Sequence, residues 1–204
     1  MAGVLVCVVA LGAAACGDDE SQPGDEARPA GEVPEWPAPD DPMERTIEAG
    51  LTPAVKEHLD VHRHSHLDVL VDGEPVVVPA GIGIDITNPG VKSFPDGGYG
   101  GIDECADPCI SPLHTHDATG VIHTESAEDE LLTLGQLFTE WGVELDDECV
   151  GEFCEADTDI AVYIGREEYD GDPRDIELED QRQIAIVIGT PPDEIPDRAD
   201  FSQA

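Results

Sequence analysis

The stretch LHTHDATGVIHTE (residues 113–125) is the starting point for the fold, because it combines strand and turn signals with three of the seven histidines of the chain. A His-x-His step is followed by the turn-forming residues Asp-Ala-Thr-Gly and then by two β-branched residues before the third histidine. This order predicts a β-hairpin with the imidazoles on one face. Three imidazoles on one face are a geometry typical of a metal site.

The length of the hairpin loop decides whether the histidines share a face. If Ala118 and Thr119 form a two-residue loop, His114 pairs with His123. A four-residue loop pairs His116 with His123 instead, whereas a three-residue loop turns His123 to the opposite face. Opposed Cβ atoms lie ~5 Å apart, so either even loop allows the three imidazoles to converge on one ion.

Three neutral imidazoles suit zinc, copper or another late first-row divalent ion and leave at least one coordination position. The candidates for that position are a second His-x-His step, His64 and His66, or the carboxylates of Asp117 and Glu125. A site completed by protein ligands predicts storage, delivery or a structural role. A site completed by water predicts hydrolysis, with Glu125 or Asp117 as general base. Surface histidines of a metal-free extracellular interaction module are the third interpretation.

A second hairpin is predicted upstream of this stretch, over residues 67–78. Apolar residues alternate through residues 67–71, Asp72-Gly73 provides a strong two-residue turn signal, and an apolar run returns at residues 76–78. Three histidines precede it with a parity opposite to that of the apolar residues, namely His62, His64 and His66. His58 and His62 are interpreted as surface residues.

A capping box at Thr133 and Gln136 predicts a helix that packs an apolar face on the core and ends at Gly142. Thr52-Pro53 predicts a second short helix running towards Leu59. Strands are expected at residues 160–164, 176–178 and 184–188, the last of them central, and an irregular strand at 79–84. These elements predict an α+β fold: one antiparallel, β-rich domain over residues 46–204 with one or two short helices.

The first residues predict an export signal. The apolar run over residues 4–15 is too short to anchor in a bilayer and leads through Ala13-Ala14-Ala15 to Cys16. This pattern over residues 1–16 is similar to a lipobox, in which Cys16 is lipidated, and an ordinary signal cleaved near Ala15 is the alternative. Residues 17–45 are rich in Asp, Glu, Pro and Gly and predict a disordered tether. We therefore expect a protein exported to the outer face of the cytoplasmic membrane, which it contacts through its lipid alone.

The charge of the chain excludes one class of partner. Asp and Glu number 47 against 9 Lys and Arg, giving a formal net charge of -38. A surface of this charge repels nucleic acid. Acidic residues dispersed along the chain are also typical of adaptation to high salt, where screening weakens self-repulsion.

Four cysteines remain outside the export segment: Cys105, Cys109, Cys149 and Cys154. An even number of cysteines in an exported chain predicts disulfides. Three connectivities are open, and the two local pairs are sterically feasible. The alternative is that Cys105 and Cys109 coordinate Cu(I) as thiolates beside the histidines.

Four segments together resemble a mostly uncharacterised family of exported bacterial and archaeal proteins: His-x-His-Leu-x-Val at 64–69, PAGIGI at 79–84, LHTHDATGVIH at 113–123 and TLGQLF-x-x-WG at 133–142. The resemblance implies export and a shared fold, and it assigns no activity. From the residues themselves we expect an extracytoplasmic copper- or zinc-binding protein rather than an enzyme, with zinc-dependent hydrolysis as the first alternative.

Overall fold

The computed structural model describes Met1 and residues 33–95, 97–102, 104–197, 199 and 201. The predicted signal peptide, the lipobox with Cys16 and the first half of the predicted tether lie outside these residues. Neither α-helix of the described part is long and apolar enough to cross a membrane.

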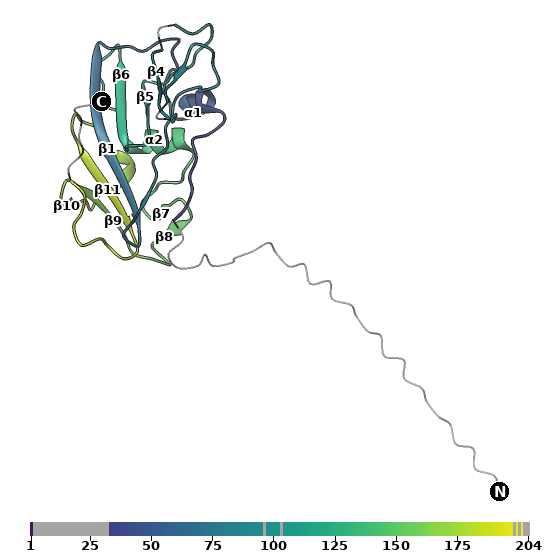
Figure 1. Ribbon diagram of the computed structural model, residues 1–204. Coiled ribbons are helices and arrows are strands. Elements are labelled where there is room, and N and C mark those ends of the chain that lie inside the picture. Colours follow the sequence, from purple (N-terminus) through teal and green to yellow (C-terminus); the bar gives the residue numbers. More distant parts are fainter. Residues whose placement is uncertain (2–32, 96, 103, 198, 200, 202–204) are drawn as a thin grey trace. The chain divides into compact units, whose positions relative to one another are not determined.

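The described residues form an α+β, β-rich domain, as predicted (Figure 1). Its helices are α1 (Pro42–Glu48) and α2 (Leu134–Trp141), with a short 3₁₀ helix at Pro173–Asp175. The strands of the main sheet are β1 (Val61–Val71), β2 (Glu74–Val76), β5 (Leu113–His114), β6 (Val121–Ser126), β9 (Ile160–Ile164), β10 (Glu167–Glu168) and β11 (Gln183–Ile188). Two small pairs lie apart from it: β3 (Lys92–Ser93) with β4 (Tyr99–Gly100), and β7 (Cys149–Val150) with β8 (Phe153–Cys154).

Strand β1 is the centre of the sheet, whose order is β10-β9-β11-β1-β6-β5 with β2 also paired to β1. Its first half pairs antiparallel with β6, and its second half pairs with β11 in parallel and with β2 antiparallel (Figure 1). Asp72 and Gly73 both have positive φ, of 51° and 81°, as a two-residue hairpin turn requires. The predicted β1–β2 hairpin and the central position of β11 are confirmed.

Helix α2 covers one face of this sheet and begins with the predicted capping box. The Thr133 side chain accepts the Gln136 N–H, and the Gln136 side chain accepts the Thr133 N–H. The helix ends at Gly142, whose φ of 77° is left-handed. The apolar side chains that α2 contributes to the main core are Leu134, Leu137, Phe138 and Trp141. The strands β1, β5 and β6 contribute side chains that include Leu67, Val69, Leu113 and Ile122.

The folded part begins earlier than residue 46, so the predicted tether extends too far. The ring of Trp36 packs edge-on against that of Trp141 at 5.7 Å between centroids. The Trp36 carbonyl also accepts the Trp141 indole N–H at 3.0 Å. Helix α1 follows, with Pro42 in its first turn. Burial of one large aromatic ring thus brings an acidic, proline-rich segment into the fold.

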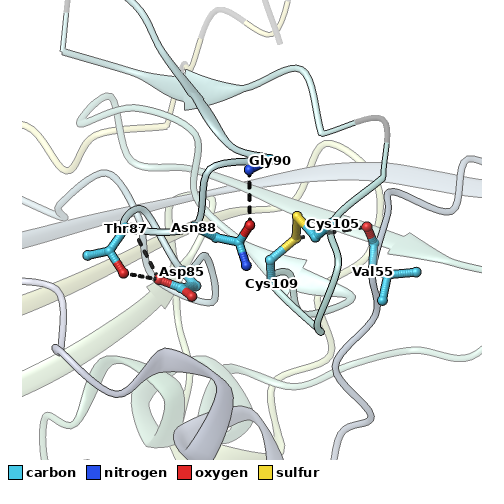
Figure 2. The surroundings of a disulfide bond; sticks show 7 residues. All are labelled: Val55, Asp85, Thr87, Asn88, Gly90, Cys105 and Cys109. Atoms are coloured by element: carbon cyan, nitrogen blue, oxygen red, sulfur yellow. Dashed lines mark hydrogen bonds between the residues drawn. A yellow bond between two sulfur atoms is a disulfide. The ribbon is translucent and has the colours of Figure 1, made fainter.

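The helix expected from Thr52-Pro53 is wrong, because the backbone there bonds to another segment. The Ala54 N–H donates to the Ile110 carbonyl, and the Ala54 carbonyl accepts the Cys109 N–H. The Val55 carbonyl accepts the Cys105 N–H in the same way (Figure 2). Residues 79–84 and 176–178 are not strands either, and each contributes a single β-bridge.

Two disulfides are present among the described residues, and both follow the local connectivity. One joins Cys105 to Cys109 (Figure 2). The other joins Cys149 to Cys154. The first lies in a small second core with Ile84, Ile102 and Ile110. Disulfides persist in oxidising compartments, which fits a protein outside the cytoplasm. Because the four sulfur atoms are paired, they do not provide thiolates for Cu(I).

Candidate metal centre

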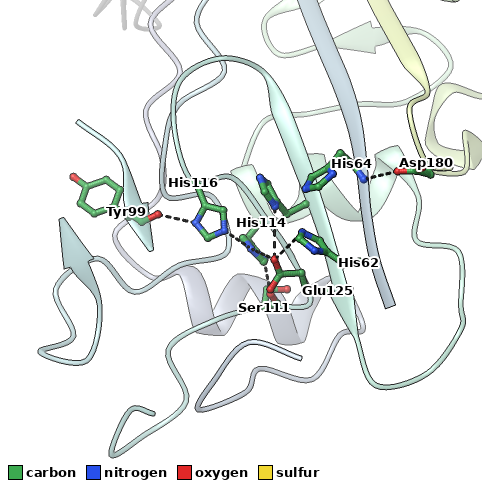
Figure 3. Close-up of polar contacts among 9 residues, drawn as sticks. His62, His64, Tyr99, Ser111, His114, His116, Glu125 and Asp180 are labelled. Atoms are coloured by element: carbon green, nitrogen blue, oxygen red, sulfur yellow. Dashed lines mark hydrogen bonds and ion pairs between the residues drawn. The ribbon is translucent and has the colours of Figure 1, made fainter. Parts of the chain in front are cut away.

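A row of histidines crosses three neighbouring strands. His64 of β1 pairs with His123 of β6, and His123 pairs with His114 of β5. Two residues away, His62 of β1 pairs with Glu125 of β6. Directly opposed residues share a face of a sheet, so these side chains gather on the face opposite the main core (Figure 3).

The pairing of His114 with His123 agrees with one of the two predicted registers, but the loop is longer than two residues. The chain leaves the sheet after His114 and returns at Val121. In between, the Thr115 N–H donates to the Ile82 carbonyl, and the His116 carbonyl accepts the Tyr99 N–H. These bonds draw residues 115–120 towards the segment that carries β3 and β4.

Backbone carbonyls fix the rings of His114 and His116. His114 Nδ1 lies 2.9 Å from the Ser111 carbonyl, and His116 Nδ1 lies 2.7 Å from the Tyr99 carbonyl (Figure 3). A carbonyl oxygen only accepts, so each Nδ1 carries the proton. Each neutral ring therefore presents an unprotonated Nε2 with its lone pair.

The two Nε2 atoms face each other at 3.2 Å. With both protons on Nδ1, this approach is not a hydrogen bond between neutral rings, and two lone pairs at this distance repel. A cation bound to both removes the repulsion. Two ligands at ~2.05 Å from a tetrahedral ion lie about 3.3 Å apart, close to the observed separation.

His123 and Glu125 complete a group of four possible ligands. Glu125 Oε1 lies 3.7 Å from His123 Nδ1 and 3.9 Å from His114 Nε2. One ligand atom from each of His114, His116, His123 and Glu125 lies within 4.8 Å of the others. His123 Nδ1 and Glu125 Oε2 are buried without a hydrogen-bond partner among the described residues. Such atoms cost about 1–3 kcal/mol each, which a bound cation would offset.

Burial and neighbouring imidazoles keep His64, His114 and His116 neutral. Burial, reinforced by His116 and His123, holds the pKa of His114 well below its usual value. Burial and His123 lower the pKa of His116 as well. Burial, His123 and His62 lower the pKa of His64 to about 4. Neutral imidazole is the form that binds metal ions.

A second group of possible ligands consists of His62, His64 and His123, again with one atom from each within 4.8 Å of the others. His64 is one of the predicted partners. The interpretation of His62 as a surface residue is confirmed, since its side chain is 38% exposed, and its Nε2 also lies 3.3 Å from Glu125 Oε1. The sequence signal that could have placed His62 beside the other histidines is its spacing from His64, because alternate residues of a strand lie on the same face.

Neither group contains His66 or Asp117. His66 Nε2 lies 2.8 Å from the Thr119 carbonyl, and its Nδ1 lies 3.4 Å from Asp68 Oδ2. Although burial lowers it, the pKa of His66 is raised overall by Asp68 and by the Thr119 carbonyl. Asp117 is exposed, and its carboxylate accepts the N–H and the hydroxyl of Thr119. Structurally, His66 and Asp117 therefore hold the 115–120 loop.

A pocket of about 480 Å³ opens beside the histidines. Its lining includes His62, His116, His123 and Glu125, and the aromatic side chains of Phe94 and Tyr99 form part of its wall. The ligand groups are thus accessible from one side to an ion or a small molecule.

Comparison of the chain with family models, with curated proteins and with solved structures finds no match in any of the three. The geometry of the histidines therefore has to carry the functional argument by itself.

Proposed function

We propose that this protein binds a transition-metal ion, zinc or copper, outside the cytoplasm through His114, His116, His123 and Glu125. The observation that carries the proposal is the 3.2 Å approach of the Nε2 atoms of His114 and His116, whose protons are held on Nδ1 by backbone carbonyls. Three imidazoles and one carboxylate suit zinc or copper(II). Four ligands from the protein favour storage or delivery of the ion.

Metal analysis of the purified protein tests this proposal. After incubation with zinc or copper(II) and desalting, the wild type should retain at least one equivalent, and the His114→Ala/His116→Ala/His123→Ala variant should retain almost none. His58→Ala is the matched control, since His58 belongs to neither ligand group. If the triple variant does not fold, the single variant His116→Ala replaces it in the test, because His116 is only partly buried. His116→Ala should weaken metal binding at least tenfold. Equal, substoichiometric metal in wild type and variants would refute the proposal.

We also propose that Cys16 is lipidated and anchors the protein to the outer face of the cytoplasmic membrane. The Ala13-Ala14-Ala15-Cys16 sequence supports this proposal, and the two disulfides support export. Mass spectrometry of the membrane fraction should find diacylglyceryl-modified Cys16 as the first residue. The Cys16→Ala variant should lose the modification. An unmodified mature chain that begins elsewhere would refute the anchor.

The pocket supports a second candidate, zinc-dependent hydrolysis, because a small substrate could reach the ligands there. Two residues that line the pocket are candidates for the general base. They are Asp117 and, where it does not bind the ion, Glu125. The zinc-loaded protein should hydrolyse p-nitrophenyl acetate faster than the metal-free protein. Asp117→Asn should lower that rate without lowering the zinc content. Equal rates with and without zinc would exclude hydrolysis of this ester.

A further inference from the structure

We propose that the centre holds a second transition-metal ion, bound by His62, His64 and His123 next to the first. This inference rests on the proposed function, because the two sites share His123. One atom from each of the three histidines lies within 4.8 Å of the others. The ring centroids of His62 and His64 lie 4.5 Å apart, and those of His64 and His123 also lie 4.5 Å apart.

The first ligand group leaves His62 and His64 unused. A four-coordinate ion is satisfied by His114, His116, His123 and Glu125, and neither His62 nor His64 belongs to that group. The buried Nε2 of His64 has no hydrogen-bond partner among the described residues. A buried polar atom is stabilised by a hydrogen-bond partner or by a bound ion, and two further imidazole rings lie beside this one.

Strand β1 holds His64 in place through its backbone. The His64 N–H donates to the Asp180 carboxylate (Figure 3). The His64 carbonyl accepts the Gln181 N–H. On the opposite edge of β1, His64 pairs with His123. A ligand whose backbone is held in this way is preorganised for an ion.

His123 lies between the two groups. Its ring centroid is 4.4 Å from that of His116 and 4.5 Å from that of His64. Neutral imidazole has a free lone pair on only one of its two nitrogens. His123 therefore binds two ions as an imidazolate: its N–H proton passes to solvent, and each nitrogen then binds one ion. Glu125 Oε1 lies 3.3 Å from His62 Nε2 and 3.7 Å from His123 Nδ1, so its carboxylate is also placed to balance charge in both groups.

The two positions differ in access. His114 is fully buried, whereas the His62 side chain is 38% exposed and lines the pocket. The second ion has three histidine ligands and a side that faces the pocket, so we expect it to bind more weakly and exchange faster than the first.

Equilibrium dialysis against copper(II) chloride distinguishes one site from two. The wild type should bind two equivalents, and the His62→Ala/His64→Ala variant should bind one. His58→Ala is the control and should bind two. One equivalent in both the wild type and the double variant would refute the second site and leave the first intact. No binding by the wild type would refute the proposed function itself.

Electron paramagnetic resonance tests whether the sites are adjacent. Two Cu(II) ions that share His123 should couple, so the spectrum at two equivalents should integrate to fewer spins than the copper present. The His62→Ala/His64→Ala variant should show an uncoupled signal that accounts for all of its copper. A fully loaded wild type that shows two independent spins would refute a shared histidine.

Discussion

The tautomers of the ligand histidines are set by backbone groups rather than by side chains. The carbonyls of Ser111 and Tyr99 accept from Nδ1 of His114 and His116. No side-chain substitution removes these acceptors directly, so ring orientation depends on the path of the main chain. The two segments that provide the carbonyls are part of the candidate metal centre as much as the imidazoles are.

Glu140 is a buried acid outside the centre. Its side chain is fully enclosed, and its Oε1 accepts the Thr46 hydroxyl at 2.8 Å. Burial raises the pKa of Glu140 from 4.5 to about 8, against hydrogen bonds with Ser111 and Thr46 that lower it. The carboxyl is therefore protonated in the folded protein at neutral pH.

This shift makes stability depend on pH in a defined direction. The pKa of Glu140 is higher in the folded protein than in the unfolded chain. The contribution of this pKa difference to the free energy of unfolding is therefore complete below pH 4.5 and is lost as pH rises through 8. The total loss accumulates between pH 4.5 and about pH 8 and is at most about 5 kcal/mol. Urea denaturation of the metal-free protein between pH 6.5 and 9 should show a falling free energy of unfolding. Glu140→Gln should remove most of the fall, and an equal fall in both proteins would contradict this role.

The connection between β2 and β5 covers the histidine face and depends on close backbone contact. Gly83 lies in it with φ of +69°, and a Cβ there would meet the Leu113 carbonyl at 2.3 Å and His114 Cβ at 3.2 Å. Only glycine allows the connection to approach β5 this closely.

Gly83→Ala should therefore displace β5 and disturb the metal centre. We expect a loss of about 3 kcal/mol or more in the free energy of unfolding, together with weaker zinc binding. Gly165→Ala is the matched control, since φ there is +62° but no atom lies within 4 Å of the added Cβ. It should cost about 1 kcal/mol from backbone strain and leave zinc binding unchanged. Equal effects of the two substitutions on zinc binding would contradict the steric argument.

Elements specified by local sequence were predictable, and elements that depend on distant partners were not. Asp72-Gly73 and the Thr133–Gln136 capping box determine their turn and helix start within a few residues, and both predictions are confirmed. Thr52-Pro53 has an equally good helix signal, but its backbone bonds to the loop of the first disulfide. The pairing of His114 with His123 was predictable from residue parity. The inclusion of His62 was not, because it depends on how far β1 extends.

The net charge of -38 is a property of the whole molecule and acts against the compact state. Ion pairs such as Arg166–Asp197 and Arg174–Asp172 involve partly exposed arginines, and pairs of this kind contribute little. Raising potassium chloride from 0.1 to 2 M should raise the urea midpoint, because the Debye length falls from about 10 Å to about 2–3 Å. A midpoint that is unchanged or lower in 2 M salt would show that self-repulsion does not limit stability.

The histidine row has one further consequence for the chain as a polymer. Ligands on β1, β5 and β6 come from positions around 62–64, 114–116 and 123–125, so a bound ion acts as a reversible cross-link between segments far apart in sequence. A cross-link that closes a long loop removes conformational entropy from the unfolded chain. Under the proposed function, metal binding and folding are thermodynamically linked, and a chelator should lower the free energy of unfolding of this protein.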